Sequence, residues 1–404
     1  MSVRDQPVYN KIALSTTLPL LIALAACGGN STTPTANGAA ATDTASAPAS
    51  ASTPASASSP VEASAPTEAS VTAEASAPGS ASSPEVSTPP QAGQWAAASA
   101  GQMLDVTLGE LHPTQAALGY DQIYYKLGRY EADPTKKFDD FCADEGLDSL
   151  ATNGSSASSK LTDSTSFTCT TTDTAQRDTT VLNPVVIGPN GDSLYLTDGH
   201  HGLSTYYEVP DGGPTLHVHV IVKDNLSAYS GTTFWSEMQN RGYTRLKDAN
   251  GAPITAAQLP TGLGLKQGMQ NDVYRSLVYF TRDIGYSKPT PSTDFLEFYW
   301  ADWLRANFPL TGYTLTTLGA TDPDPATADI GYLNAVWNAS LKMVATTDPV
   351  IDGKTGKDLG RLDAINAGKK YTKGEFGDLL KPLSASKPGK LAYTLDYKAR
   401  NGLK

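Results

Sequence analysis

Two adjacent histidines in a short polar turn are the residues of this sequence whose types and spacing best suit chemistry. An apolar strand, Leu194–Leu196, runs into Asp198, Gly199, His200 and His201, where a helix is expected to begin. A helix start presents unpaired backbone N–H groups that favour anions such as phosphate, and Gly199 would let the backbone turn sharply. The two imidazoles could donate to phosphate, bind a metal or transfer protons near neutral pH. The alternative is a helix capped by Asp198, with two surface histidines.

A second pair of histidines lies in a strand expected over residues 216–223. Strand side chains alternate between two faces. His217 and His219 therefore share one face, while the other carries Leu216, Val218, Val220 and Val222. If this strand neighbours the one that enters the turn, four of the chain's five histidines could converge on a metal ion. The alternative is a half-exposed sheet face, because no cysteine or carboxylate spacing accompanies these two histidines.

The first 27 residues are typical of a bacterial export signal. Positive residues precede an apolar stretch over 12–26 that is too short to span a bilayer comfortably. Its end, Leu24-Ala25-Ala26-Cys27, resembles the lipobox of bacterial lipoproteins, in which cleavage leaves a lipid-modified cysteine. Gly28 fits the pattern sorted to the outer membrane of Gram-negative cells. We therefore expect an envelope protein attached to a membrane through lipidated Cys27, on the periplasmic or the surface side. The alternative is a plain secretory signal with an incidental cysteine.

Residues 28–98 are almost entirely Ala, Ser, Thr, Pro and Gly, with a few Glu. Such a composition cannot offset the entropy of ordering, so a disordered tether is expected. The whole chain of 404 residues has a net charge of −11 and an isoelectric point near 4.9. No basic surface is therefore available for nonspecific nucleic-acid binding, although a local basic cleft stays compatible with this charge.

Besides Cys27, the chain contains only Cys142 and Cys169. In an exported protein two remaining cysteines most often form a disulfide. The intervening loop is rich in Ser, Thr, Gly and Asp, and closing it would stabilise the fold by about 3 kcal/mol in the chain-entropy model.

The rest of the chain mixes strand and helix periodicities, which predicts an α+β fold with a mainly helical extension. Strands are expected over 103–110, 184–189, 193–196 and 216–223, and helices over 116–127, 234–238, 272–284, 294–305 and 325–345. Gln115 and Lys126 lie on a polar stripe of the first helix, which is usually a solvated face. The expected parts are an α+β domain over 99–230 with an insertion at 143–180, a helical part over 231–310, and a loosely packed extension over 311–404.

The order of these pieces resembles the ParB-like nuclease family, distant relatives of the ParB and sulfiredoxin fold. The residues that carry the resemblance span about residues 100–310: Leu111-His-Pro-Thr-Gln115, Leu118-Gly-Tyr120, Lys126, Pro184-Val-Val186, Asp198-Gly-His-His201, Phe234-Trp235, Tyr274-Arg-Ser-Leu277, Gly285-Tyr286 and Phe298-Tyr-Trp-Ala-Asp302. The resemblance implies a small mixed sheet with helices, in which the histidine turn lies at the mouth of a phosphate-binding cleft.

Phosphoester or phosphodiester hydrolysis is the chemistry that this resemblance favours. His200 and His201 would act as general acid, general base or phosphate donor, and Asp198 would orient an imidazole or hold a cation. Phosphate or ligand binding would fall to Thr114, Gln115, Lys126, Gly199 and Gly202. A divalent metal is a cofactor that such a site could use, and a nucleic acid or another phosphoester would be its ligand.

One position departs from the family pattern. Relatives commonly place an arginine after the histidine pair, where this chain has Gly202. The change removes a permanent positive charge suited to bidentate phosphate contact, which Lys126 could replace if its helix lines the cleft. The second hypothesis is therefore a lipoprotein that keeps the fold to bind a ligand or partner without catalysis.

Overall fold

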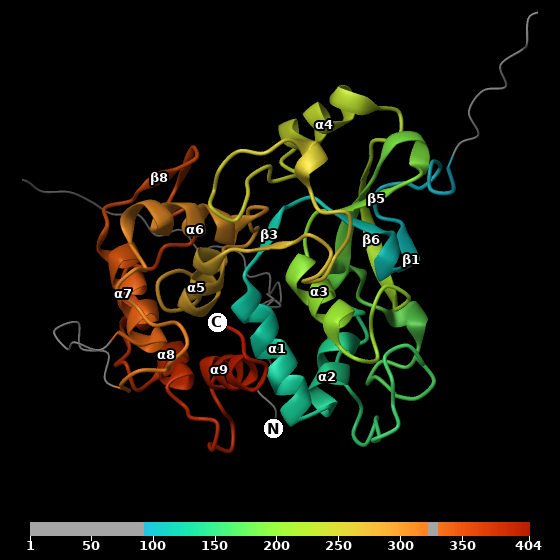
Figure 1. Cartoon of the computed structure of the whole chain (residues 1–404). Coiled ribbons are helices and arrows are strands. Elements are labelled where there is room, and N and C mark those ends of the chain that lie inside the picture. The colour runs from blue at the N-terminus through green and yellow to red at the C-terminus, as the bar shows by residue number, and fades with distance from the viewer. Residues whose placement is uncertain (1–92, 322–329) are drawn as a thin grey trace, which may run out of the picture. The chain divides into compact units, whose positions relative to one another are not determined.

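The computed structural model describes residues 93–321 and 330–404, all within one compact unit that spans Glu85–Lys404 (Figure 1). The expected export signal, the lipidated Cys27 and nearly all of the expected tether lie outside these described residues. The division of the chain into five parts stays a prediction. No helix in the described ranges is both long and apolar enough to cross a membrane.

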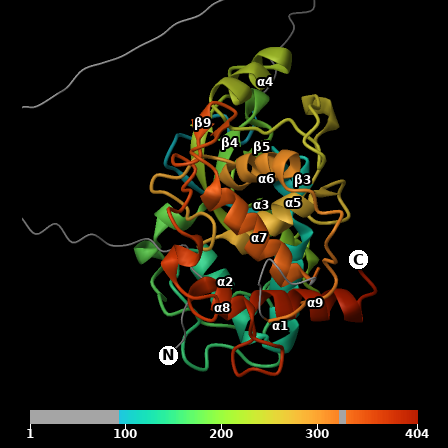
Figure 2. The ribbon, with the colours of Figure 1, turned by 90° about the vertical axis from the view of Figure 1, so that its left-hand side faces the viewer.

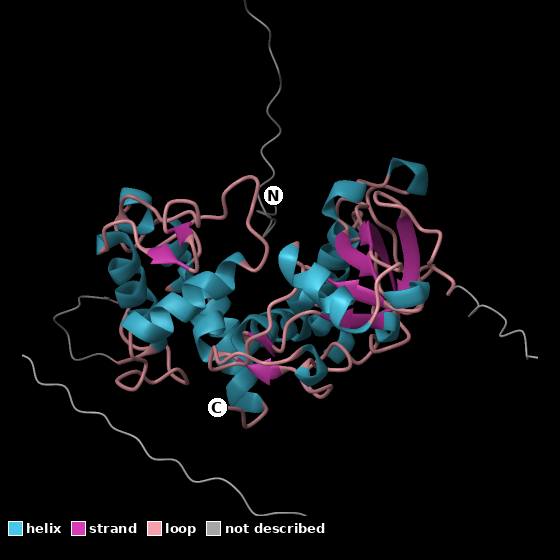
Figure 3. Ribbon diagram, turned by 90° about the horizontal axis from the view of Figure 1, so that it is seen from above, coloured by secondary structure: helices cyan, strands magenta, loops and turns pink. Residues whose placement is uncertain are grey.

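A five-stranded mixed sheet forms one side of the unit (Figure 3). Its strands are β1 (Met103–Thr107), β6 (His217–Asn225), β4 (Asn183–Ile187), β5 (Leu194–Leu196) and β2 (Leu111–Pro113), in that spatial order. The β1/β6 and β4/β5 pairs are antiparallel, whereas β4/β6 and β2/β5 are parallel. The α+β class and the mixed sheet expected from the sequence are confirmed.

Alternation along β6 explains which face of this strand packs into the core. Val218, Val220 and Val222 are buried, while His217 and His219 face the other side of the sheet. The turn between β4 and β5 gives the expected antiparallel hairpin. Because period-two burial fixes which face of a strand meets the core, a register shift by one residue would expose all three valines.

Three helices share a hydrophobic core with this sheet: α1 (Tyr120–Ala132), α2 (Thr135–Asp144) and α3 (His200–Glu208). The helix expected from residue 116 begins later, at Tyr120. Residues 111–113 form β2 and residues 117–118 form the short strand β3 (Ala117–Leu118), which pairs in parallel with β7 (Gln270–Asn271). Residues 111–113 and 117–118 are therefore strands, and the helix begins only after them.

The second half of the chain is mainly helical, as expected (Figures 1 and 2). Most of its helices pack around a second hydrophobic core that contains the fully buried Trp300 and Tyr286; α4 instead packs its buried Phe234 and Met238 against Val186 and Leu226. The elements are α4 (Gly231–Asn240), α5 (Val273–Thr281), α6 (Leu296–Asn307), α7 (Tyr332–Ala345), the hairpin β8 (Val350–Ile351) and β9 (Lys354–Thr355), α8 (Gly374–Leu379) and α9 (Lys390–Arg400).

The last helix corrects the expectation of a loosely packed extension. Helix α9 lies along α1, where Leu391 is fully buried and Lys398 Nζ is 2.9 Å from Asp121 Oδ1. Tyr332 in α7 donates its hydroxyl to the other oxygen of Asp121, at 2.9 Å. The end of the chain is therefore bound to the first helix through a buried ion pair.

The disulfide expected between Cys142 and Cys169 is confirmed, with the two Cα atoms 5.6 Å apart. It ties the end of α2 to the segment that follows it. Phe167, two residues before Cys169, packs against Phe138 and Phe141 of α2. The loop rich in Ser and Thr is thus anchored to the core by one covalent bond and one aromatic cluster.

Candidate functional site

The turn before α3 contains a glycine whose backbone N–H is paired within the turn. Gly199 has a φ of 86°, and its N–H donates to Asp198 Oδ1 at 2.7 Å. A Cβ added at Gly199 would lie 1.9 Å from Asn183 Oδ1, so only glycine fits this position. The carboxylate of Asp198 therefore occupies one backbone donor of this turn.

The two histidines at the start of α3 are buried and accept hydrogen bonds from a distant strand segment. His200 is 3% exposed, and its Nε2 accepts from the Thr114 N–H at 3.2 Å. His201 is 9% exposed, and its Nε2 accepts from the Gly119 N–H at 2.9 Å. An imidazole nitrogen that accepts cannot carry the proton, so both rings are Nδ1–H tautomers when neutral. We call these two bonds the histidine clamp.

Burial keeps the histidine clamp neutral. It lowers the pKa of His200 to about 4, although the nearby Asp198 acts in the opposite direction. Burial also lowers the pKa of His201 well below its usual value, and the positive charge of Arg275 lowers it further. Near pH 7 neither ring carries the positive charge that attracts a phosphate.

The polar atoms of Thr114 are all engaged within the protein. Its hydroxyl donates to the Leu196 carbonyl at 2.7 Å, and its own carbonyl accepts from the Arg245 N–H at 2.9 Å. That carbonyl also accepts from the Thr244 hydroxyl at 2.8 Å. The neighbouring Gln115 is buried and donates from Nε2 to the Ala117 carbonyl at 2.7 Å. These two predicted phosphate ligands therefore link the histidine clamp to residues 244 and 245.

Lys126 belongs to a separate cluster of charges between α1 and α2. Its Nζ is 3.2 Å from Asp140 Oδ2, and Arg129 and the Tyr130 hydroxyl contact the same carboxylate. Lys126 is thus already paired, and no contact joins it to the histidine clamp.

Gly202 faces α2 across a small space. A Cβ added there would have one neighbour within 4 Å, Asp144 Oδ2 at 3.7 Å. Burial raises the pKa of Asp144, which accepts a hydrogen bond from the Tyr206 hydroxyl at 2.8 Å. Gly202, where the sequence resemblance led us to expect an arginine, therefore lies beside a half-buried carboxyl group.

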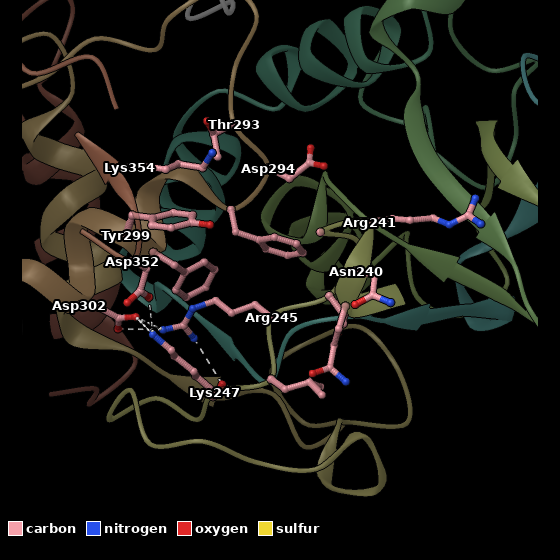
Figure 4. Close-up of a pocket in the computed structure, with 16 residues that line it drawn as sticks. Asn240, Arg241, Arg245, Lys247, Thr293, Asp294, Tyr299, Asp302, Asp352 and Lys354 are labelled. Carbon is pink, nitrogen blue, oxygen red and sulfur yellow. Dashed lines mark hydrogen bonds and ion pairs between the residues drawn. The ribbon is translucent and has the colours of Figure 1, made fainter. Parts of the chain in front are cut away.

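A polar cavity of about 680 Å³ is lined by Arg245, whose backbone N–H donates to the Thr114 carbonyl (Figure 4). Three parts of the chain build it: the end of α4 with the strand-like segment after it, the first turns of α6, and the β8–β9 hairpin. Its lining consists of Gln239, Asn240, Arg241, Gly242, Thr244, Arg245, Leu246, Lys247, Thr293, Asp294, Phe295, Phe298, Tyr299, Asp302, Asp352 and Lys354. We call this the Arg245 cavity.

Ion pairs order one wall of the Arg245 cavity (Figure 4). Arg245 is 8% exposed, and its Nη2 is 2.8 and 3.0 Å from the two oxygens of Asp302. Its guanidinium carbon lies 4.2 Å from the centre of the Phe298 ring. Lys247 Nζ bridges Asp302 and Asp352 at 2.9 and 2.8 Å. Burial alone would raise the pKa of Asp302, but Arg245 and Lys247 lower it, so this carboxylate is ionised.

The cavity lining is positive by one charge, although the whole chain is acidic. Four cationic residues and three aspartates line it, which gives +4 − 3 = +1. Asp294 is paired with Lys223 outside the lining, at 2.7 Å. Lys354 projects into the cavity beside Thr293 and Tyr299 (Figure 4), and its Nζ has no hydrogen bond or ion pair to the residues that the structure describes. Lys354 is therefore the cation best placed to meet a ligand.

Sequence reasoning located part of this arrangement. It placed Thr114, Gln115 and the histidine turn in one site. The structure brings Thr114 into contact with His200, whereas the side chain of Gln115 bonds to Ala117. Phe298 and Asp302 carried the family resemblance without an assigned role. The cations Arg245, Lys247 and Lys354 were not identified from the sequence. The signal that could have suggested two of them is that Arg245 and Lys247 alternate along an extended segment. The predicted catalytic roles of Asp198, His200 and His201 stay predictions.

Comparison with known proteins gives one family match. A family model described as "Putative ParB-like nuclease" matches residues 104–306, half of the chain. The match contains the histidine clamp and most of the Arg245 cavity, but ends before Asp352 and Lys354. The crystal structure of protein Atu1540 from Agrobacterium tumefaciens is similar over 60% of this chain and 91% of that chain, with 22% identity and a TM-score of 0.38. No curated protein matches the chain.

Proposed function

Since the chain belongs to the ParB-like nuclease family, we propose that it is a lipid-anchored envelope protein whose family domain binds a phosphoester in the Arg245 cavity. One observation carries the proposal. Nε2 of His200 and of His201 is already occupied as a hydrogen-bond acceptor within the fold, whereas Lys354 lines a cavity of net positive charge and has no hydrogen bond or ion pair among the residues that the structure describes. In this account His200 and His201 are positioning residues, which hold the backbone of Thr114 and Gly119 by hydrogen bonds.

The chemistry of the lining suits an anionic ligand with a planar or sugar portion. Lysine is a flexible point charge that phosphate-binding sites use, and Lys354 and Lys247 are both within the lining. The rings of Phe295 and Tyr299, which are only partly buried, offer apolar faces beside these charges. A volume of about 680 Å³ lies within the range of sites for small ligands. A nucleotide or a short piece of single-stranded nucleic acid has both features.

Hydrolysis of the bound phosphoester is the second candidate function. The family's description favours it, and so does the position of Asp352, whose side chain is 59% exposed while it lines the cavity. In that mechanism Asp352 would take a proton from the attacking water as the phosphorus–oxygen bond to the leaving group breaks. The sequence-based alternative assigns the proton transfers to His200, His201 and Asp198.

Calorimetric titration of the full chain with adenosine 5′-monophosphate tests the binding proposal. Adenosine is the neutral comparison, because it presents the base and the sugar without the charge. Lys354→Gln should weaken binding of the monophosphate by about tenfold or more, since a hydrogen bond to a charged group is worth about 1.5–3 kcal/mol. The matched control is Lys357→Gln, in the same segment but outside the cavity lining.

Two results would contradict binding in the Arg245 cavity. One is equal affinity for the monophosphate in the Lys354→Gln and Lys357→Gln variants, and the other is equal affinity of the wild-type chain for adenosine and its monophosphate. Turnover of bis(p-nitrophenyl) phosphate by the same proteins tests hydrolysis separately. Activity lost in Asp352→Asn but kept in His200→Gln would support the cavity mechanism, and the opposite pattern would support the histidine mechanism.

The lipid anchor requires its own experiment. Cys27→Ser should move the protein from the membrane fraction to the soluble fraction of the envelope and should abolish incorporation of labelled palmitate. Separation of inner and outer membranes by density would test the outer-membrane assignment. Unchanged fractionation of Cys27→Ser would refute the anchor, but it would leave the Arg245 cavity proposal untouched.

A further inference from the structure

The outer face of β6 carries two histidines that the histidine clamp and the Arg245 cavity do not use. His217 and His219 alternate with buried valines, so both imidazoles project from the same face of the strand. In the antiparallel β1/β6 pair, Asp105 lies opposite His219 and Thr107 lies opposite His217. The two histidines therefore stand next to each other, with a carboxylate beside them.

Each of these imidazoles is oriented by its own carboxylate. His217 Nδ1 is 2.9 Å from Asp105 Oδ1, and His219 Nδ1 is 2.6 Å from Glu145 Oε2. Glu145 also accepts from the His219 backbone N–H at 2.9 Å and pairs with Arg177 at 2.9 Å. An ionised carboxylate can only accept, so Nδ1 is the donor in both rings. In the neutral imidazoles, Nε2 is then left with its lone pair free.

The disulfide-tied insertion forms a wall over this face. A cavity of about 810 Å³ is lined on one side by His217, His219 and Asp105, and on the other by residues of the segment 161–177. Within the described part of the chain, neither Nε2 atom has a hydrogen-bond partner. The charged groups of the lining are Asp105, Glu145 and Arg177, which gives a net charge of −1 before either histidine is protonated.

We propose that His217 and His219 form a binding site for a divalent transition metal ion of the Zn²⁺ or Cu²⁺ class, with Nε2 of both rings as ligands. Histidines that bind metals usually donate their other N–H to a carboxylate, which fixes the tautomer and the ring orientation. Both rings show this arrangement, and the net negative charge favours a cation. The site does not rest on the proposed phosphoester function.

Binding one shared metal ion requires the two rings to tilt toward each other. Residues two apart on a strand are separated by about 7 Å, and imidazole nitrogens bind Zn²⁺ at about 2.0–2.1 Å. No cluster of three or more His, Cys, Asp or Glu side chains that could hold a metal is found in residues 93–321 and 330–404. The protein therefore supplies two nitrogen ligands, and water or a molecule in the 810 Å³ cavity completes the coordination. For such ligands Cu²⁺ should bind more tightly than Zn²⁺.

Titration of the full chain with Cu²⁺, followed by electron paramagnetic resonance, tests the site. The wild-type chain should bind one ion whose spectrum shows two nitrogen ligands. His217→Ala and His219→Ala should each reduce the affinity at least tenfold and leave one nitrogen in the spectrum. His112→Ala is the control, because His112 lies on β2 against Tyr195 and not in this cavity. Its affinity for Cu²⁺ should equal that of the wild type.

A further variant distinguishes a built site from two exposed rings that bind metal incidentally. Asp105→Asn changes an exposed carboxylate that is bonded to Nδ1 of His217, the ring nitrogen that does not bind the metal. The fold should therefore be preserved. Loss of such a carboxylate typically lowers metal affinity by about 10–100-fold. The proposal is overturned if Asp105→Asn binds Cu²⁺ as tightly as the wild type. It is equally overturned if the double variant His217→Ala/His219→Ala retains the wild-type affinity.

Discussion

Acidification should weaken the fold through the histidine clamp, and His200 allows the effect to be calculated. The pKa of His200 is about 4 in the folded protein, against about 6.5 in an unfolded chain. The unfolded state therefore binds more protons between these two values. Stability contributed by His200 is fully present above about pH 6.5 and is lost as the pH falls toward about 4. His201, whose pKa is also lowered, acts in the same direction.

The expected size of the effect follows from the two pKa values. The complete loss for His200 is about 3 kcal/mol, and about 2 kcal/mol of it has already gone at pH 5. Urea unfolding of the full chain between about pH 5 and pH 7.5 measures this directly. Carboxylates also titrate in this range, so the contribution of His200 must be isolated with a variant that cannot gain a proton.

His200→Gln is that variant, because the amide oxygen of Gln can approach the position of Nε2 and still accept from the Thr114 N–H. Between about pH 7.5 and pH 5, its free energy of unfolding should fall by about 2 kcal/mol less than that of the wild type. His200→Leu should instead be destabilised at every pH by about 1–3 kcal/mol, because it leaves the buried Thr114 N–H without an acceptor. His217→Gln, at a side chain 68% exposed, is the matched control.

The reasoning would be refuted by identical pH profiles of the wild type and His200→Gln. That result would mean that His200 is as easily protonated in the folded protein as in the unfolded chain, and the imidazole could then serve as a proton donor near neutral pH.

Three further predictions concern stability. Cys142→Ser/Cys169→Ser should lower the unfolding free energy by about 3.5 kcal/mol, from a sequence separation of 27 residues in the chain-entropy model; an unchanged urea midpoint would contradict it. Gly202→Ala should raise the thermal midpoint through a gain of about 0.5–1 kcal/mol, because the helix is favoured and the nearest atom is 3.7 Å away; a fall would show that the space is not open. Lys398→Met should cost about 3–5 kcal/mol in chemical unfolding, since it leaves Asp121 buried without its cation; a neutral result would mean that this pair is hydrated.

The elements that the sequence predicted are those with strong local periodicity. The alternating valines of β6 and the turn between β4 and β5 needed no distant partner, and both were placed correctly. Helix α9 could not be recognised as packed, because its polar composition hides a partner far along the chain. Lys398 pairs with Asp121, 277 residues away, and only the tertiary structure brings them together.

In the candidate site, too, the contacts between residues far apart in the chain could not be predicted from the sequence. The sequence indicated that Thr114 and His200 belong to one site, yet not that the ring accepts from a backbone N–H 86 residues away. That hydrogen bond makes Nε2 an acceptor and leaves the proton of the neutral ring on Nδ1. Lys126 likewise looked free on its helix, but Asp140 in the next helix pairs with it.

The Arg245 cavity was beyond sequence reasoning for a geometric reason. Its cations come from two segments that are far apart in the sequence: Arg241, Arg245 and Lys247 follow α4, and Lys354 lies in a hairpin more than a hundred residues later. No single stretch is basic, and the chain as a whole is acidic. A positive site in such a chain becomes visible only when the lining residues are assembled.

The most direct test of this account is the protonation state of the histidine pair. A long-range hydrogen–nitrogen correlation spectrum of the full chain, labelled with nitrogen-15 histidine and recorded from about pH 7.5 to pH 5, reports which ring nitrogen carries the proton. His200→Gln and His201→Gln assign the two signals. The account predicts two Nδ1–H tautomers that stay neutral to about pH 5. Rings that titrate near pH 6.5, or that carry the proton on Nε2, would contradict the histidine clamp and return these residues to the role of acid and base.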